Sequence, residues 1–215
     1  MIFYDLHSHK PSQQAEDVTI ISVDLREQYI LSEDMAKSGH VGYYSAGVHP
    51  WYIDKNRLPV LRKLAALPSV VAIGETGLDK NRGDYLLQLD FFEEHILLSE
   101  KVTKPLIIHC VKAWDDLLRI QKALKPTQPW IIHGFRGNEN LATQMLNTGM
   151  YLSFGIHHNI ASLKAAWDKK RLFIETDDTD INIRDVYALI ANNLNITINE
   201  LLDEAKDLFK KFSFI

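Results

Sequence analysis

The feature that most constrains the fold of this chain is a series of eight short apolar runs that alternate with longer segments of helical periodicity. Several runs are apolar at consecutive positions, which is typical of parallel strands that are buried on both faces. Among the intervening segments, residues 84–100 have the clearest helical pattern, with apolar side chains at steps of three and four residues (Leu86, Leu89, Phe92 and Ile96). We therefore predict strands near residues 2–5, 18–23, 43–48, 69–74, 105–109, 129–133, 149–154 and 171–175.

Eight parallel strands with intervening helices predict a (β/α)8 barrel of the TIM type, a fold that typically needs about 250 residues. This chain has 215 residues, so we expect a compact barrel that forms one domain over residues 1–215. The first crossover, residues 10–17, is short and polar, and we expect an abbreviated element there. Near the other end, Thr197-Ile-Asn-Glu200 has the form of a capping box, which predicts a last helix through Phe209.

Composition narrows the class of protein. The hydrophobic fraction of 46% and the charged fraction of 24% are ordinary for a globular protein, and a net charge of −4 does not suit a polycation that grips long nucleic acid. No apolar run approaches the roughly 18 residues that span a bilayer, and the N-terminus lacks the pattern of a signal peptide. The single cysteine, Cys110, cannot form an internal disulfide. We therefore expect a cytoplasmic protein with no membrane partner, present as a monomer or weak oligomer.

Two predicted strands share an unusual end, since "KPLIIHC" and "QPWIIHG" both close on a histidine, His109 and His133. A histidine at the end of one apolar run is commonly a core residue, but enzymes of this fold build their sites at the C-terminal ends of the strands. The first strand ends in "DLHSH", where His7 and His9 face the same side because alternate residues of a strand do so. The repeated pattern favours a shared site.

Two carboxylates join these histidines, because the fourth predicted strand ends in "IGETG" with Glu75 and the eighth in "ETD" with Asp177. Taken singly, each has a structural alternative such as a helix cap. Together, six ionisable groups in one barrel mouth would be costly without a compensating charge, which divalent cations supply. Imidazole suits zinc, iron or nickel, and carboxylate suits magnesium or manganese, so the donors do not select one metal. The count, with Glu75 able to bridge, suits two ions about 3.5 to 4 Å apart.

The motifs "DLHSH", "GVHPW", "AIGETGLD", "PLIIHC", "WIIHGFRG" and "FIETD" occur in this order, and the series resembles that of the TatD-type metal-dependent hydrolases, a branch of the amidohydrolase-like barrels. The resemblance covers residues 1 to about 180, and residues 188–209 are similar to the closing helices of that family. It implies a (β/α)8 barrel with two divalent ions (Mg, Mn or Zn). It also implies hydrolysis of an ester bond, the phosphodiester of DNA or of a small substrate, as in a deoxyribonuclease.

The resemblance also implies roles for individual residues. It assigns His7, His9 and Asp177 to one ion, His109 and His133 to the other, and Glu75 to both. Asp177 and Glu75 are then the catalytic residues, and Asp177 orients the attacking water or takes its proton. His49, in "GVHPW", matches a family motif without being a ligand by this comparison, and we expect it to contact the phosphate or to support the ligands.

Departures from the family pattern concern the substrate. Val111 followed by Lys112 stands where the family usually has arginine, and Arg136 stands where serine is common. The segment "DDTDINIRD" after the eighth strand is shorter than its usual counterpart. We predict that Lys112 and Arg136, with His49, contact the substrate and hold phosphates that flank the scissile one. Solvated surface cations are the structural alternative.

Two other functions stay open. A cyclic amidohydrolase that acts on a small amide or ester would use the same histidines, but such barrels often place a carboxylated lysine where this chain has Glu75. A barrel that binds a metal or ligand without turnover is the other alternative, and the complete set of six ligands argues against it.

Overall fold

The computed structural model describes residues 1–25 and 42–215. Its strands form one eight-stranded sheet in chain order, in which the pairs β1–β2, β3–β4, β4–β5 and β7–β8 are parallel. These strands are β1 (Tyr4–Ser8), β2 (Val18–Asp24), β3 (Tyr43–Gly47), β4 (Val70–Asp79), β5 (Leu106–Val111), β6 (Trp130–Ile132), β7 (Tyr151–Phe154) and β8 (Leu172–Ile174). The described helices are η1 (Lys55–Arg57), α2 (Leu58–Ala65), α3 (Tyr85–Val102), α4 (Trp114–Leu124), α5 (Glu139–Asn147), α6 (Ile160–Asp168), α7 (Ile183–Leu194) and α8 (Ile198–Lys211). The alternation confirms the (β/α)8 class.

All eight predicted strands are present, but three of them end more than one residue beyond the predicted end. β1 continues to Ser8, whereas its predicted end is residue 5. β4 continues to Asp79, so Glu75 lies inside this strand and not at its end. β5 continues to Val111, two residues beyond His109. Asp177 is the third residue after β8. Residues 9–17, which the structure describes throughout, contain no helix, and this confirms the abbreviated first crossover.

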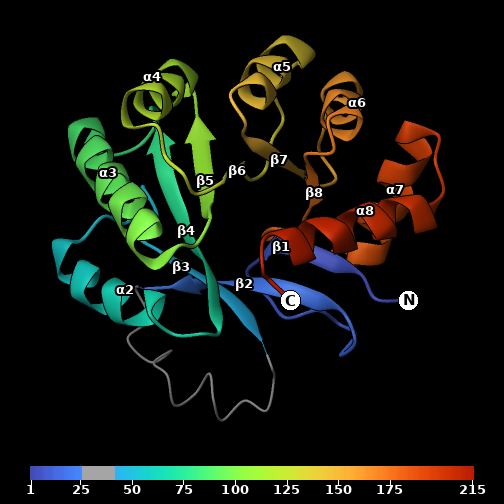
Figure 1. Ribbon diagram of the computed structural model, residues 1–215, viewed down its shortest axis with the longest axis horizontal. Helices are drawn as coiled ribbons and strands as arrows, with labels where there is room; N and C mark the ends of the chain where they lie inside the picture. The colour runs from blue at the N-terminus through green and yellow to red at the C-terminus, as the bar shows by residue number, and fades with distance from the viewer. Residues whose placement is uncertain (26–41) are drawn as a thin grey trace. The chain divides into compact units, whose positions relative to one another are not determined.

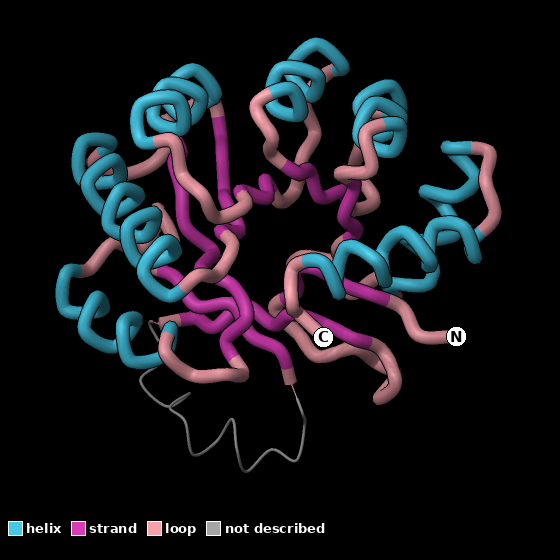
Figure 2. The backbone as a smooth tube through the Cα atoms, in the orientation of Figure 1, coloured by secondary structure: helices cyan, strands magenta, loops and turns pink. Residues whose placement is uncertain are grey.

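The chain divides into two compact units, which we call the terminal unit (Met1–Ile21 and Ile132–Ile215) and the central unit (Ser22–Ile131). In the central unit, α2, α3 and α4 pack on the strands β3 to β5 (Figure 1). In the terminal unit, α8 packs on β1 and β8, and α5 and α6 pack on β7 (Figure 2). The organisation of residues 1–215 as a single domain stays a prediction.

Helix α3 is amphipathic, but its buried face differs from the predicted one. Phe92 and Ile96 are buried as expected, whereas Leu86 is 74% exposed. The buried face instead includes two polar side chains, Gln88 and His95, neither of which is exposed to solvent. Burying a polar group is unfavourable unless it forms hydrogen bonds, so their partners explain the departure.

Both polar side chains of α3 bind backbone groups near the ends of neighbouring strands. The side-chain amide of Gln88 accepts from the N–H of Asp79 at 2.7 Å and donates to the carbonyl of Asp79 at 3.1 Å. The ring of His95 accepts from the N–H of Val48 through Nε2 at 2.8 Å, and its Nδ1 donates to the Phe91 carbonyl at 2.6 Å. The helix therefore fixes the backbone at the ends of β3 and β4.

The last helix, α8, closes the terminal unit. Its first turn forms the predicted capping box, in which Thr197 and Glu200 exchange hydrogen bonds between side chain and backbone. Aromatic side chains form the core beneath it, with the Phe173 ring 6.0 Å from Phe209 and 5.3 Å from Phe212. Among the described helices, none is both long enough and apolar enough to cross a bilayer.

Candidate metal site

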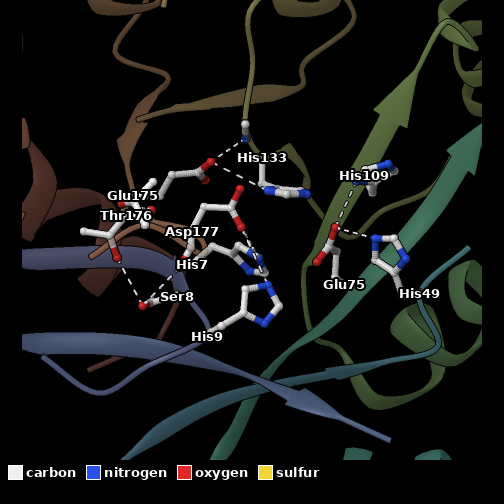
Figure 3. Close-up of polar contacts among 12 residues, drawn as sticks. His7, Ser8, His9, His49, Glu75, His109, His133, Glu175, Thr176 and Asp177 are labelled. Atoms are coloured by element: carbon white, nitrogen blue, oxygen red, sulfur yellow. Dashed lines mark hydrogen bonds and ion pairs between the residues drawn. The ribbon is translucent and has the colours of Figure 1, made fainter. Parts of the chain in front are cut away.

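The terminal unit contains a cluster of three histidines and one aspartate, which we call the terminal cluster (His7, His9, His133 and Asp177). Backbone pairing positions it, because the N–H of Asp177 donates to the carbonyl of His7 at 2.9 Å and the N–H of His9 donates to the carbonyl of Asp177 at 3.1 Å. This pairing places Asp177 Oδ1 3.6 Å from Nε2 of both His7 and His9 (Figure 3). The ring of His133, which follows β6 directly, lies 4.4 Å from that of His7.

The backbone of Asp177 has an unusual conformation, with a φ of +56°. This left-handed region is rare for residues other than glycine, and aspartate and asparagine tolerate it best. An isolated parallel bridge joins Asp177 to Ser8, so the segment after β8 continues beside β1 although β8 itself has ended. Long-range pairing therefore brings this carboxylate to the histidines.

The central unit contains a second group, which we call the central cluster (His49, Glu75 and His109). One oxygen of Glu75, Oε1, lies 2.9 Å from His49 Nε2 and 3.0 Å from His109 Nδ1 (Figure 3). Glu75 is supplied by β4, His109 by β5, and His49 by the segment after β3. Where β4 pairs with β5, Gly77 lies opposite His109, and a Cβ on Gly77 would lie 2.0 Å from the carbonyl oxygen of His109. Only glycine allows the strands this approach.

The spacing within each cluster fits a divalent cation. With metal–ligand bonds of about 2.1 Å, two ligands of one ion lie about 3.0 to 3.4 Å apart, the lower value for octahedral and the higher for tetrahedral geometry. The distances of 2.9 and 3.0 Å in the central cluster match the lower value, which is also the length of an ordinary hydrogen bond. The 3.6 Å distances in the terminal cluster are longer than a normal hydrogen bond and lie near the higher value. Imidazole nitrogens with carboxylate oxygens are suitable donors, although they do not select one metal.

Two further carboxylates, which the sequence reasoning missed, lie behind these histidines. Glu175 Oε1 is 3.6 Å from His133 Nδ1 and also accepts a hydrogen bond from the N–H of Gly134. Asp79 Oδ2 is 3.6 Å from His109 Nε2. A metal-bound histidine commonly points its other nitrogen at a carboxylate, which fixes the orientation of the ring. The motifs "FIETD" and "GLD" contain both acids, so the signal was present in the sequence.

The protonation of these acids follows from their surroundings. Burial disfavours the charged form of Glu175, but its interactions with His133, His7 and Ser153 together outweigh burial and lower its pKa. Burial likewise opposes ionisation of Asp79, but hydrogen bonds from Asn81 and Trp51, together with His109, bring its pKa below the ordinary value. Both groups are therefore carboxylates near neutral pH, as the orientation of a metal-binding histidine requires.

A third buried acid, Asp5, lies two residues before His7 and behaves differently. Burial raises its pKa to about 7, although it accepts hydrogen bonds from the side chain and backbone of Thr176 at 2.6 and 3.1 Å. These bonds join β1 to the segment after β8, beside the terminal cluster.

The predicted substrate contacts are placed as follows. His49 belongs to the central cluster, with its ring against Glu75. Lys112 follows β5 directly, Arg136 lies in the loop between β6 and α5, and both are exposed. Lys80, which directly follows β4, forms an ion pair with Asp116 at 2.8 Å. The contact of Lys112 and Arg136 with a substrate stays a prediction, and so does the pairing of His133 with His109 at one ion, because these two histidines belong to different units.

Comparison with known proteins is consistent with this site. An uncharacterised metal-dependent hydrolase, YcfH, from Escherichia coli strain K12 is 30% identical over 210 residues, which are 87% of this chain and 79% of that protein. The 3′-5′ ssDNA/RNA exonuclease TatD from Erwinia billingiae is 35% identical over 118 residues, which are 52% of this chain and 44% of that protein. The chain spans about half the length of two metal-dependent hydrolases from Buchnera aphidicola, with 47% and 43% of those proteins covered.

The fold has solved counterparts. The crystal structure of YjjV, a TatD homologue from Escherichia coli, has a TM-score of 0.81 at 20% identity and covers 98% of this chain and 97% of its own. This likeness concerns the fold alone. The structure is thus a (β/α)8 barrel that carries candidate metal ligands. The model of the family described as TatD-related DNase matches residues 8–212, and the chain belongs to that family.

Proposed function

We propose that this protein is a metal-dependent phosphodiesterase that cleaves DNA, as a TatD-like deoxyribonuclease. The observation that carries the proposal is that two separate groups of imidazole and carboxylate side chains each have the spacing of metal ligands. A relative that is named as an exonuclease of single-stranded DNA and RNA supports a nucleic-acid substrate. A cytoplasmic location stays a prediction.

We further propose that the protein binds two divalent ions, which are magnesium, manganese or zinc. His7, His9 and Asp177 hold the first, and Glu75 and His109 hold the second. By the resemblance to the family, His133 joins the second ion and Glu75 is shared by both. His49 touches the same oxygen of Glu75 as His109 does, so it either completes the second ion's ligands or orients Glu75.

Bound cations would polarise the scissile phosphate and lower the pKa of the attacking water. The protein's own residues then have separable roles. The side chain of Asp177 is 27% exposed, which leaves it able to orient a water or accept its proton while it touches His7 and His9. Glu175 and Asp79 are almost fully buried and hold the rings of His133 and His109 in place.

A matrix of metals against substrates tests this proposal. The metal-free protein would be reloaded with magnesium, manganese or zinc and assayed on single- and double-stranded DNA, RNA, a small phosphodiester and a cyclic amide. We expect metal-dependent cleavage of a phosphodiester and no turnover of the amide. Cleavage of the amide alone would instead identify a cyclic amidohydrolase, and binding of metal without any turnover would identify a barrel that is not an enzyme.

Two variants sharpen the test. Asp177→Asn removes the proton acceptor and should lower kcat by roughly 10²- to 10⁴-fold. Its neighbour Asp178 is exposed, so Asp178→Asn is a matched control that should keep wild-type activity. Glu75→Gln keeps the shape of the side chain but removes its charge, so metal content and activity should fall together. Wild-type turnover by Asp177→Asn or Glu75→Gln would contradict the assigned roles.

A further inference from the structure

Two aromatic side chains next to the central cluster are exposed. Trp51 and Tyr52 directly follow His49 and Pro50, and 41% and 45% of their surfaces are accessible to solvent. No other phenylalanine, tyrosine or tryptophan in the described ranges, 1–25 and 42–215, is exposed to this degree. Aromatic side chains dominate the energetics of cores and interfaces, so an exposed pair beside candidate metal ligands points to a binding surface.

The exposed ring of Trp51 is held in a fixed position. Its Nε1 donates a hydrogen bond to Asp79 Oδ2 at 2.7 Å, and its backbone N–H donates to Nδ1 of His49 at 3.1 Å. The ring centroid lies 4.9 Å from that of His49 and 5.7 Å from that of His109. Trp51 therefore presents a rigid apolar surface directly beside the central cluster.

A cation completes this surface. The guanidinium of Arg82 lies 4.6 Å from the centre of the Trp51 ring, and Arg82 is itself exposed. A guanidinium over an indole is attracted by the ring, and its remaining N–H groups can bind phosphate oxygens. Tyr52 lies near both rings, with its own ring 6.3 Å from that of Trp51 and 5.8 Å from that of His49.

We propose that Trp51, Tyr52 and Arg82 form a stacking surface that binds an unpaired nucleobase next to the scissile phosphate. Proteins that bind single strands combine aromatic rings, on which bases stack, with cations that follow the backbone. The faces of bases in a duplex are covered by their neighbours, so this surface selects single-stranded substrate. The inference rests on the proposed phosphodiesterase function, since it names the part of the substrate that the central unit recognises.

Binding, measured apart from cleavage, tests the stacking surface. The probes are a fluorescein-labelled hexathymidylate with phosphorothioate linkages, which resist hydrolysis, and an abasic strand of the same length and linkage. The metal-loaded wild type should bind the thymidylate roughly five- to 150-fold more tightly than the abasic strand, as expected for 1 to 3 kcal/mol of stacking. Replacing Trp51 and Tyr52 together by Ala should bring this ratio close to one.

Three further variants separate stacking from other roles. Trp51→Phe keeps a ring but loses the bond to Asp79, so it should preserve the preference for bases. Arg82→Gln should weaken binding of both strands and reduce the salt dependence by about one phosphate contact. Leu86 is a large exposed apolar residue in the same unit, so Leu86→Ala is the matched control and should bind as the wild type does.

The outcomes distinguish this inference from the proposed function. Equal affinity of the wild type for the two strands, or failure to bind either, would overturn the stacking surface even if a small phosphodiester is cleaved. The double Ala variant of Trp51 and Tyr52 could instead lose affinity for both strands equally, with Trp51→Phe losing as much. That result would also overturn the stacking surface and show that Trp51 only supports Asp79. Preference for bases without any metal-dependent cleavage would sustain the surface and refute the phosphodiesterase.

Discussion

The pH dependence of stability should reveal the buried histidine of α3. Burial lowers the pKa of His95 to about 4, compared with 6.5 for an ordinary histidine, because the charged ring would lose its hydration. In the folded state Nε2 must also accept the N–H of Val48, which a protonated ring cannot do. Protonation therefore favours the unfolded chain. The contribution of His95 to stability is present above pH 6.5 and is lost as the pH falls towards 4.

The magnitude follows from the two pKa values. Their difference corresponds to about 3 kcal/mol at 1.36 kcal/mol for each pKa unit. Linkage between protonation and unfolding places about 2 kcal/mol of this loss between pH 7 and pH 4.5. That is a large share of the 5 to 15 kcal/mol that usually stabilises a folded protein.

The comparison variant is His95→Gln, since glutamine can accept the Val48 N–H and donate to the Phe91 carbonyl but does not titrate. Urea unfolding would be followed at several pH values, with a chelator present so that metal binding does not contribute. The free energy of unfolding of the wild type, minus that of the variant, should fall by about 2 kcal/mol from pH 7 to pH 4.5. His157→Gln, at an exposed position, controls for the loss of a histidine. A difference that does not change with pH would refute the reasoning.

Three other predictions each concern a single residue. Burial raises the pKa of the Cys110 thiol to about 12, so a thiol reagent at pH 8 should modify the unfolded protein rapidly and the native protein hardly at all. Thr197→Ala removes the capping box of α8 and should lower the free energy of unfolding by about 1 kcal/mol, as urea titration would measure. Glu175→Gln removes the carboxylate behind His133, so metal affinity should fall by roughly 10- to 100-fold in a calorimetric titration while the fold survives.

The positions of the strands were predictable because continuous apolar runs have few alternatives in a chain of this length. The ends of the strands were less predictable, and the position of Glu75 inside β4 shows why. The pairing of β4 with β5 changes register between Ile73 and Thr76, which gives β4 one extra residue and carries the strand on to Asp79. Such an irregularity depends on the neighbouring strand, so the sequence of β4 alone does not show it.

The candidate ligands illustrate the same limit. That His7, His9 and Asp177 lie together was predictable from motifs at strand ends, and the structure places them in one unit. Asp177 nevertheless reaches the histidines through a left-handed backbone and a bridge to Ser8, neither of which a local pattern contains. Glu175 was missed for a related reason, since in "ETD" only the path of the backbone decides which acid faces which histidine.

Helix α3 shows how the fold of the central unit and the geometry of its cluster depend on the same bonds. Gln88 and His95 are seven residues apart, which is two helical turns, so they lie on one face. His95 binds the backbone of Val48, which directly precedes His49 of the central cluster. Gln88 binds the backbone of Asp79, whose side chain faces the same cluster. Apolar side chains at these positions would fill the core but leave two buried N–H groups without these acceptors. Departures from hydrophobic patterning are expected at functional sites. In this protein the departure lies on α3, a helix that supplies no ligand. It is placed there because α3 fixes the backbone that carries the ligands, and the ligands can be no better ordered than that backbone.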